Sequence, residues 1–292
     1  MNQGGIVLVT GAEGQLGKDM MAVLRRYGVP ARGYGRQELD VTDTEEVLRI
    51  FLRDRPFAVI HAAAFTKVDE AEQNPDLAYQ VNAFGSRNVA AAASQVGAKL
   101  IYVSTDYVFD GRASKPYNET ARTRPINVYG ASKREGERFV QLLQPSSFIV
   151  RTSWVYGPHG NNFVKTMLRQ AAVQPELKVV HDQSGCPTYT LDLAEMILRL
   201  LRTNRFGTYH VTNAGICSWH EFALAIMDEA GLSVKVRSVP TSQFPRPARR
   251  PSFSALEGWA LRLNGFPPMR PWREALADYL RRYAANGPLR KE

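Results

Sequence analysis

The stretch Ile6-Val-Leu-Val-Thr-Gly11-Ala-Glu-Gly14-Gln-Leu-Gly17 lies near the beginning of a chain of 292 residues. Its first five residues are apolar or β-branched, as expected of a strand that is buried on both faces. The glycines follow with GxxGxxG spacing, and residues 18–27 then read as a helix. Glycine permits a tight turn and close packing of helix on strand, and the free N–H groups at the helix start attract an anion. The stretch predicts a strand, a glycine turn and a helix, although its spacing differs from the GxGxxG of the standard dinucleotide fingerprint.

The same rhythm of strand and helix continues through the first half of the chain. Further strands are expected at 30–34, 57–60, 101–103 and 147–151, and helices between them at 42–54, at 75–96 and after residue 132. This alternation favours an α/β fold with a doubly wound parallel sheet, the Rossmann arrangement. Two later runs, at 177–180 and 208–211, are interpreted as strands that return to this sheet, with a helix at 192–202 between them.

The rhythm becomes less regular after residue 155. We therefore expect residues 1–152, with the returning segment at about 177–212, to form a dinucleotide-binding domain. Residues 153–176 and about 213–292 are expected to form a smaller, partly interleaved C-terminal substrate domain. The cleft between two such lobes is the expected place for a ligand.

Several helix starts carry polar residues that are suited to capping. Thr42 with Glu45, and Ser218 with Glu221, have the spacing of a capping box. Asn74 precedes a proline at the start of the long helix, which predicts that it is the N-cap.

The end of the second expected strand bears on the choice of cofactor. An acidic residue about 20 residues past the glycines would bind the ribose hydroxyls of NAD, but residues 34–37 read Tyr-Gly-Arg-Gln. Arg36, with Arg32 as a second candidate, can pair with a 2′-phosphate. We therefore expect NADPH to be preferred and NADH to be the lesser option, the alternative being an Arg36 that only faces solvent. Asp40, beside Val41, can accept a hydrogen bond from adenine, or it is an ordinary loop carboxylate.

A second informative stretch is Tyr129-Gly-Ala-Ser-Lys133, in a segment without proline until Pro145. Side chains four residues apart on a helix lie on one face, with about 5–6 Å between their Cβ atoms. A nearby ammonium group lowers the pKa of a phenol, which is roughly 10 in free tyrosine. Tyr129 is thus a candidate proton donor to a developing alkoxide, with Lys133 as its partner. The alternative is a surface tyrosine and lysine on an ordinary helix.

Small and polar residues follow the third and fourth expected strands. Small side chains after the third strand let a cofactor approach the edge of the sheet, and they are Ala62, Ala63 and Ala64. Ser104, Thr105 and Asp106 end the fourth strand. A hydroxyl of Ser104 or Thr105 can hold a substrate carbonyl against Tyr129, and Asp106 can orient a sugar hydroxyl. For both hydroxyls, hydrogen bonding to the local backbone is the alternative.

The composition narrows the classes of partner. The formal net charge is +9, yet the densest basic cluster is only Arg246, Arg249 and Arg250. Anionic small molecules are therefore favoured over nucleic acid or a membrane surface, with a solvated basic surface as the alternative. No apolar stretch approaches the roughly 18 residues of a membrane span, and no charged leader precedes the first strand. Cys186 and Cys217 form no CxxC, which is typical of the reducing cytoplasm and argues against a zinc site.

Eight motifs occur in order along nearly the whole chain. They are Gly11-Ala-Glu-Gly14-Gln-Leu-Gly17, His61-Ala-Ala-Ala-Phe-Thr-Lys-Val-Asp69, Ser104-Thr-Asp-Tyr-Val-Phe109, Pro125-Ile-Asn-Val-Tyr129-Gly-Ala-Ser-Lys133, Arg151-Thr-Ser-Trp154-Val-Tyr156, Gly160-Asn-Asn-Phe-Val-Lys-Thr-Met167, Asp182-Gln-Ser-Gly-Cys-Pro-Thr188 and Pro247-Ala-Arg-Arg-Pro251. Together they resemble the extended short-chain dehydrogenase/reductase superfamily and, within it, the dTDP-4-dehydrorhamnose reductase family.

This resemblance implies hydride transfer from NADPH to C4 of dTDP-4-dehydro-β-L-rhamnose. It implies that Tyr129 protonates the C4 oxygen, and that Lys133 binds the nicotinamide ribose and lowers the Tyr129 pKa. It also implies that Thr105 polarises the carbonyl, that Asp106 contacts the sugar and that Trp154 lines the sugar pocket. The expected cofactor-binding residues are Gly11, Gly14, Gln15, Leu16, Gly17, Arg36, Asp40, Val41, Ala62, Ala63, Ala64, Tyr129 and Lys133.

The diphosphate of such a substrate needs cations and N–H donors, for which guanidinium groups are well suited. We expect Asn162 together with Arg249 or Arg250 to supply them. The alternative for either arginine is a surface charge.

One departure from the family pattern concerns metal. Some members dimerise around magnesium held by glutamates, one of them in the helix after the glycine loop, where this chain has Lys18 and Asp19. Another follows the Pro-Thr turn, where residues 189–192 of this chain read Tyr-Thr-Leu-Asp. Lys18 has the wrong charge beside a divalent cation. We therefore expect no requirement for Mg²⁺, and a monomer or weak homodimer.

Two rival interpretations stay open. A nucleotide-sugar 4-epimerase of the same superfamily would keep NAD bound, which the absence of an acid after the second strand and the presence of Arg36 argue against. The regulatory beta subunit of eukaryotic methionine adenosyltransferase also resembles this family and binds NADP without known need for reduction. The intact set of Ser104, Thr105, Tyr129 and Lys133 favours an enzyme.

Overall fold

Six strands form the central sheet of the computed structural model, which describes residues 5–286. The strands are β1 (Val7–Thr10), β2 (Ala31–Tyr34), β3 (Ala58–His61), β4 (Lys99–Thr105), β5 (Ser147–Thr152) and β10 (Gly207–His210). Their order is β10-β5-β4-β3-β1-β2, and all neighbouring strands are parallel. The doubly wound parallel sheet predicted from the sequence is confirmed.

The chain runs from β1 to β2 on one side and then to β3 on the other side of β1. Such a reversal opens a crevice at the carboxyl ends of the flanking strands, where ligands bind in this class of sheet. The glycine turn after β1 and the three alanines after β3 both face this crevice. The order of strands thus decides where a cofactor can lie.

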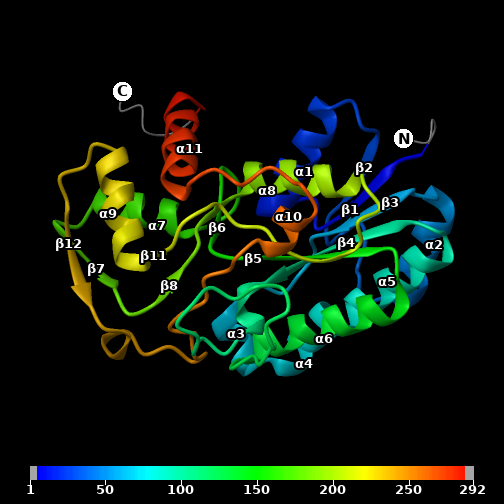
Figure 1. The fold of residues 1–292 in the computed structure, drawn as a ribbon, viewed down its shortest axis with the longest axis horizontal. Helices are drawn as coiled ribbons and strands as arrows, with labels where there is room; N and C mark the ends of the chain where they lie inside the picture. The colour runs from blue at the N-terminus through cyan, green and yellow to red at the C-terminus, as the bar shows by residue number, and fades with distance from the viewer. Residues whose placement is uncertain (1–4, 287–292) are drawn as a thin grey trace.

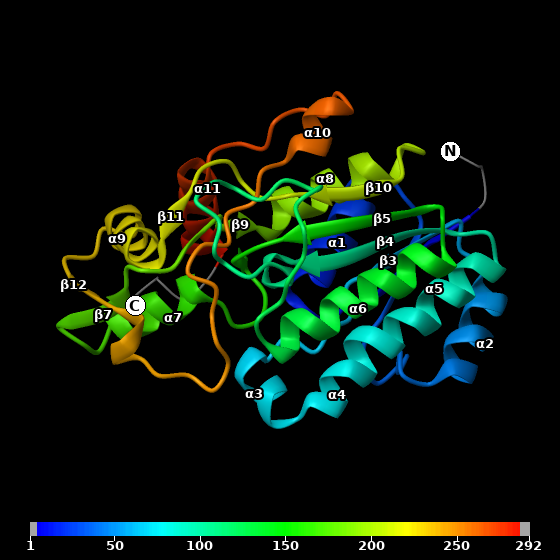
Figure 2. The same ribbon diagram turned by 60° about the horizontal axis from the view of Figure 1, so that its bottom comes forward.

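Helices cover both faces of the sheet (Figure 1, Figure 2). One face carries α2 (Thr44–Asp54), α5 (Ser86–Gln95) and α6 (Val128–Leu143), whose apolar side chains share a buried core with β1, β3, β4 and β5. The other face carries α1 (Gln15–Arg26), α8 (Thr190–Leu201) and α10 (Trp259–Leu263), which pack on the sheet in a second core. All residues of β1 and β3 are buried, which explains why both strands are apolar except for their last residues, Thr10 and His61.

A second lobe lies beside the carboxyl end of the sheet, on the left in Figure 1. Its helices are α7 (Phe163–Ala171), α9 (Trp219–Glu229) and α11 (Trp272–Asn286). Its strands pair in twos: β7 (Glu176–Val180) with β12 (Lys235–Val239), β6 (Val155–Tyr156) with β9 (Thr188–Tyr189), and β8 (Ser184–Gly185) with β11 (Cys217–Ser218). A third apolar core, rich in aromatic rings, holds these elements together.

The strand expected at 177–180 exists, but the prediction that it returns to the central sheet is wrong. It forms β7 and pairs with β12 in the second lobe, whereas the run at 208–211 does join the central sheet as β10 next to β5. Both runs are short, and a short run of strand-forming residues does not encode which strand it pairs with. Residues 177–180 therefore belong with the second lobe.

Two predictions of helix starts need correction. Helix α1 begins at Gln15 rather than after Gly17, with Gly14 as its N-cap. Helix α2 is capped by Asp43, whose carboxylate accepts from the N–H groups of two residues in the first turn, so the capping box predicted for Thr42 is wrong. Thr42 instead donates its hydroxyl proton to Asp40, at 2.8 Å.

The long helix expected at 75–96 is interrupted. It consists of α4 (Pro75–Tyr79), a π-helical turn, η1 (Gln80–Gly85), and α5, and a separate short helix α3 (Val68–Gln73) precedes it. Asn74 occupies the predicted N-cap position before Pro75, but its side chain makes no cap hydrogen bond and instead donates to the carbonyl of Glu70. The capping box predicted for Ser218 and Glu221 is confirmed at the start of α9.

Two short 3-10 turns, η2 (Asp106–Val108) and η3 (Thr241–Gln243), complete the helical segments. Within the described part of the chain, the helices are all too short or too polar to cross a membrane. The expectation that no charged leader precedes the first strand concerns residues 1–4, which lie outside the described range.

Candidate active site

A cavity of about 580 Å³ lies at the crevice between β1 and β3. Most residues that were predicted to bind the cofactor line it, namely Gly11, Gly14, Arg36, Asp40, Val41, Ala62, Ala63 and Ala64. Gly11 has φ +65°, and a Cβ atom there would lie 2.7 Å from the backbone nitrogen of Ala63. Only glycine therefore leaves the turn and the alanine segment close together. The cavity, the glycine turn and the start of α1 fit a dinucleotide.

The other members of the glycine turn have structural contacts. A Cβ atom at Gly17 would lie 2.1 Å from the carbonyl oxygen of Gly11, so glycine is required for α1 to pack against the turn. Leu16 packs against the core under the sheet. Gln15 donates to the carbonyl of Val155 at 3.0 Å and thereby joins the turn to the second lobe. Cofactor contacts for Gln15, Leu16 and Gly17 stay predictions.

The two arginines considered for a 2′-phosphate differ in their surroundings. Arg32 pairs with Asp54 at 2.6 Å, so its charge is already engaged. Arg36 lines the cavity, and within residues 5–286 no carboxylate pairs with it. The Asp40 carboxylate accepts two hydrogen bonds from Thr42 through one oxygen and leaves the other for a ligand. Arg36 is thus the better candidate for a phosphate.

Tyr129 and Lys133 lie in the first turns of α6, a helix that is capped by Asn127. Lys133 is buried, donates to the carbonyl of Val103 at 2.7 Å and lies 4.1 Å from the ring centre of Tyr102. Burial lowers the pKa of Lys133 to about 7. The helix therefore delivers both residues of the predicted pair to the carboxyl end of β4.

The half-buried Tyr129 behaves differently from the expectation. Burial raises the pKa of Tyr129 to about 12, an effect that Thr105 reduces and the charge of Asp106 increases. Lys133 contributes no lowering here, because its own pKa of about 7 leaves the amine uncharged at the pH where the phenol ionises. Its amino group donates to the Val103 carbonyl. The expectation that Lys133 lowers the Tyr129 pKa is therefore wrong for this arrangement of side chains.

Thr105 and Asp106 lie next to the phenol. The Thr105 hydroxyl donates to Asp106 Oδ1 at 3.0 Å, and Oδ2 of Asp106 has no hydrogen-bond partner in the described part of the chain. Because this carboxyl group is 3% exposed, burial raises its pKa to about 7. A buried carboxylate oxygen without a partner is costly and is suited to a ligand hydroxyl.

The structure does not support a substrate contact for Ser104. Its hydroxyl is buried and donates to Glu137 at 2.6 Å. Successive residues of a strand point to opposite faces, so Ser104 faces helix α6 while Thr105 faces the site. Glu137 also accepts two hydrogen bonds from Arg151, each 2.8 Å long. This buried ion pair was not predicted from the sequence, in which the only indication of it is that Glu137 follows Lys133 by four residues.

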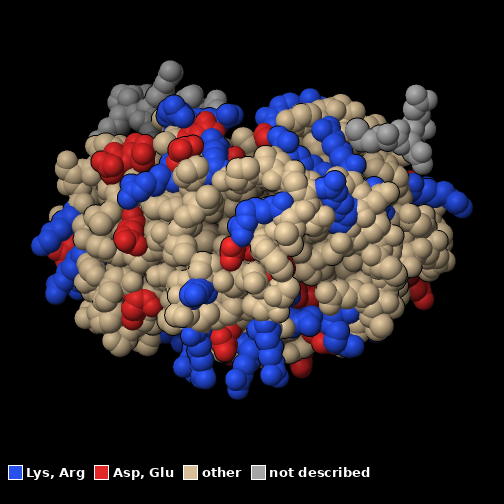
Figure 3. All heavy atoms as spheres, viewed as in Figure 1, with Lys and Arg blue, Asp and Glu red and all other residues tan. Residues whose placement is uncertain are grey.

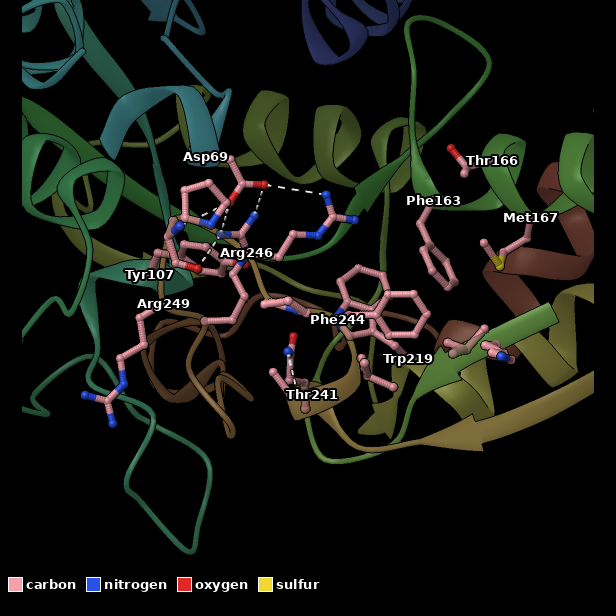
Figure 4. A pocket seen from close by; sticks show the side chains of 18 of the residues that line it. Asp69, Tyr107, Phe163, Thr166, Met167, Trp219, Thr241, Phe244, Arg246 and Arg249 are labelled. Atoms are coloured by element: carbon pink, nitrogen blue, oxygen red, sulfur yellow. Dashed lines mark hydrogen bonds and ion pairs between the residues drawn. The ribbon is translucent and has the colours of Figure 1, made fainter. Parts of the chain in front are cut away.

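A second cavity, of about 810 Å³, lies between the two lobes (Figure 4). Phe163, Trp219 and Phe244 form an aromatic wall, and Tyr107 lies on the other side of the cavity, near Asp69. Basic and polar groups complete the lining, including Lys178, Gln183, Arg246, Arg249 and Arg250. The rings of Tyr107 and Tyr129 meet edge to face, with centres 5.7 Å apart, which connects this cavity with the predicted proton donor.

The predicted arginines play separate roles in this cavity. Arg250 binds both oxygens of Asp69, at 2.8 and 2.9 Å. Arg249 is exposed and turns its guanidinium group away from that ion pair in Figure 4. On the face of the molecule drawn in Figure 3, several Lys and Arg side chains project from the lower edge, and basic and acidic side chains are interspersed elsewhere. Of these two arginines, Arg249 is the one without an ion pair in the described part of the chain, and its guanidinium group also points away from Phe244 and Trp219 in Figure 4.

Two other predicted substrate residues are less directly placed. Trp154, which has φ +47°, stacks on Trp219 with ring centres 3.5 Å apart, and it is Trp219 that lines the cavity. Asn162 caps α7 and donates to Gln15 at 2.8 Å, so it links the lobes instead of lining the cavity between them. Trp219 could have been singled out in the sequence because it directly follows Ser218, the predicted cap of helix α9.

The positions discussed for a metal are brought together without forming a metal cluster. Thr190 donates its hydroxyl proton to the buried carboxylate of Asp19, and His159 lies 3.6 Å from the same carboxylate. No group of three or more histidine, cysteine or acidic residues with the geometry of a metal site occurs between residues 5 and 286. Within the described residues, the candidate cofactor and substrate sites thus consist of the two cavities and the start of α6, without a metal cluster.

Comparisons with known proteins agree with this geometry. The RmlD substrate binding domain family model matches residues 5–285. The spore coat polysaccharide biosynthesis protein SpsK of Bacillus subtilis (strain 168) is 44% identical over 274 residues, which cover 94% of this chain and 96% of that protein. The dTDP-4-dehydrorhamnose reductase of Aggregatibacter actinomycetemcomitans is 42% identical over 294 residues, with 95% and 99% covered.

A crystal structure of dTDP-4-dehydrorhamnose reductase from Bacillus anthracis str. Ames, in complex with NADP, is similar throughout. Its TM-score is 0.94 at 48% sequence identity, and the match covers 96% of this chain and 99% of that one.

Proposed function

This chain belongs to the RmlD substrate binding domain family, and we propose that it reduces the C4 ketone of dTDP-4-dehydro-β-L-rhamnose with NADPH, giving dTDP-L-rhamnose. One observation carries the proposal. Tyr129 lies on the capped end of α6, against the ring of Tyr107, which lines the cavity between the lobes, while the dinucleotide cavity opens at the same edge of the sheet.

The side chains around Tyr129 suit the protonation half of this reaction. NADPH, when bound, supplies the hydride that C4 receives. Because its pKa is about 12, the Tyr129 phenol carries its proton at neutral pH and can release it to the C4 oxygen as the C–O double bond becomes single. Thr105, whose hydroxyl donates to Asp106 in this structure, can turn to donate a hydrogen bond to the same oxygen. Lys133 would bind the ribose of the nicotinamide.

The charge and ring content of the larger cavity suit a nucleoside diphosphate sugar. Lys178, Arg246, Arg249 and Arg250 outnumber the single carboxylate of Asp69 in its lining. A diphosphate would be bound by this excess of cations, and the aromatic wall would pack on a base and a sugar. Asp106 is suited to a sugar hydroxyl through its unpartnered oxygen.

The rival functions fit less well. An NAD-retaining epimerase would need an acceptor for the ribose hydroxyls at the end of β2, where the cavity presents Arg36. A purely regulatory NADP-binding subunit would not need the proton donor, the hydroxyl of Thr105 and the buried Lys133 in one place. A reductase uses all of them.

Three finer points are also proposed. The enzyme needs no Mg²⁺, because this chain has Lys18 and Asp19 where the family has a glutamate, Lys18 has the wrong charge and Thr190 donates to Asp19. It acts as a monomer or weak homodimer, since no metal then joins two copies. It works in the cytoplasm, because both cysteines are free and buried. Activity that EDTA abolishes and magnesium restores would contradict the first point.

The test is an assay of NADPH oxidation with dTDP-4-dehydrorhamnose, with other dTDP-4-keto sugars in parallel. The wild type should consume one NADPH per sugar reduced. Tyr129→Phe should lose most of its turnover and still bind NADPH. Full activity in Tyr129→Phe, or catalytic interconversion of sugars without consumption of NADPH, would refute the proposal.

A further inference from the structure

Asn127, the residue that caps the catalytic helix, uses both atoms of its side-chain amide. Its Oδ1 accepts from the backbone N–H of Gly130 at 2.8 Å, which fixes the first turn of α6. Its Nδ2 donates to the carbonyl of Arg249, also at 2.8 Å. The side chain is 7% exposed, so both bonds are protected from water. One buried residue therefore touches both the turn that carries Tyr129 and the loop that lines the larger cavity.

The same loop is held at two further points by helix α3. Asp69 accepts from the backbone N–H of Ala248 at 3.2 Å and pairs with the guanidinium group of Arg250, as the dashed lines at Asp69 in Figure 4 show. Residues 248, 249 and 250 are thus each fixed from the cofactor-binding side of the molecule. Because the side chains of 246–250 line the cavity, a ligand that binds there pulls on these contacts.

Helix α3 also reaches the catalytic helix directly. Glu72, one turn after Asp69, accepts from the backbone N–H of Val128 at 2.8 Å. The loop at 246–250, helix α3 and the start of α6 therefore form a closed set of polar contacts. A shift of the loop must be taken up either by these hydrogen bonds or by the turn that carries Tyr129.

We propose that Asn127 is a positioning residue, which transmits the binding of the substrate's diphosphate at the loop 246–250 to the orientation of Tyr129. The proposal rests on the proposed function. Binding energy from a part of the substrate that does not react can be used to orient the reacting groups. In this molecule the route is short: Arg249 carbonyl, Asn127 amide, Gly130 N–H and the Tyr129 backbone beside it.

Two substitutions distinguish the hydrogen bond from Asn127 to the Arg249 carbonyl from the role of Asn127 as the cap of α6. Asn127→Asp keeps the shape and the oxygen that accepts from Gly130, but faces the Arg249 carbonyl with an acceptor. Asn127→Ser is also a good N-cap, and its side chain is too short to reach the loop. The matched control is Asn118→Asp. The Asn118 side chain also accepts from a nearby backbone N–H, that of Thr120, and it lies outside both cavities.

Steady-state kinetics of NADPH oxidation with dTDP-4-dehydrorhamnose give the first readout. We expect kcat of both Asn127 variants to fall about tenfold, the equivalent of one lost hydrogen bond in the transition state. The dissociation constant of NADPH and the melting temperature should stay near the wild-type values, and Asn118→Asp should match the wild type. Unchanged kcat, or a loss that only follows falling NADPH affinity and melting temperature, would overturn the proposal.

Hydrogen exchange gives a second readout that needs no turnover. Addition of dTDP should slow amide exchange in the first turn of α6 in the wild type and leave it unchanged in Asn127→Asp. Equal slowing in both proteins, or no effect in the wild type, would overturn the coupling. A wild type that shows this dTDP effect but no reduction of the keto sugar would instead refute the proposed function and leave the coupling intact.

Discussion

Replacing Glu137 by glutamine tests the buried ion pair behind the catalytic helix. Glutamine keeps the shape of the side chain but removes the charge that Arg151 and Ser104 contact at 2.6–2.8 Å. Arg151, whose side chain is 5% exposed, would keep its positive charge in the interior without a counter-ion. Removal of one partner from a buried pair costs about 3–5 kcal/mol.

This cost converts into a measurable change of melting temperature. Unfolding entropies of about 2.1 cal/mol/K per residue give about 0.6 kcal/mol/K for a chain of 292 residues. The midpoint of thermal unfolding, followed by circular dichroism, should therefore fall by about 5–8 °C in Glu137→Gln.

The control is Glu135→Gln on the same helix. Glu135 pairs with Arg138 at 2.7 Å, but the two side chains are 33% and 55% exposed. An exposed pair contributes about 0.5 kcal/mol or less, so this variant should melt within about 1 °C of the wild type. If both variants melt alike, or if Glu137→Gln matches the wild type, the reasoning about the buried pair is wrong.

The same substitution should change the pH dependence of activity. Burial lowers the pKa of Lys133 to about 7, and the charge of Glu137 opposes that effect. Without this carboxylate the Lys133 pKa falls further, so the ammonium is lost at a lower pH. The alkaline limb of the rate profile should move to lower pH in Glu137→Gln, and a profile with no such shift would count against a role for the Lys133 charge.

Three further predictions concern the glycine turn, the cofactor cavity and the buried carboxylate beside Tyr129. Gly17→Ala would place a Cβ atom 2.1 Å from the Gly11 carbonyl oxygen, whereas Gly14→Ala would place one at 3.1 Å. Gly17→Ala should therefore have a lower melting temperature than Gly14→Ala and bind NADPH at least tenfold more weakly in fluorescence titrations. Arg36→Ala should raise KM for NADPH about 10- to 100-fold, as expected when charge-assisted hydrogen bonds are lost, and should leave KM for NADH unchanged. The control is Arg32→Ala, because Arg32 already pairs with Asp54. The pKa of Asp106 is raised from 3.8 to about 7, so its ionisation destabilises the folded state as the pH rises from about 4 through 7. The free energy of unfolding of Asp106→Asn should therefore exceed that of the wild type by up to about 4 kcal/mol at pH 8 and should not exceed it below pH 4. Denaturant unfolding at a series of pH values measures the difference.

The sequence by itself determined the class of fold and most of the cofactor cavity. The apolar strands buried on both faces and the glycines of the turn have local physical reasons, namely burial and close backbone approach, and these can be read from residue type and spacing. Gly11, Arg36 and the alanines after β3 needed no further information to be placed at one edge of the sheet.

Only the tertiary structure decided which partner each segment and each polar group takes. The run at 177–180 is as apolar as a central strand, yet it pairs with β12. Ser104 and Thr105 are chemically alike, and the pleat of β4 turns one toward Glu137 and the other toward the site. The ammonium of Lys133 binds a carbonyl of β4, a contact that helical spacing cannot predict. Partner choice depends on contacts between residues far apart in the chain, and a local pattern of residue types carries no record of them.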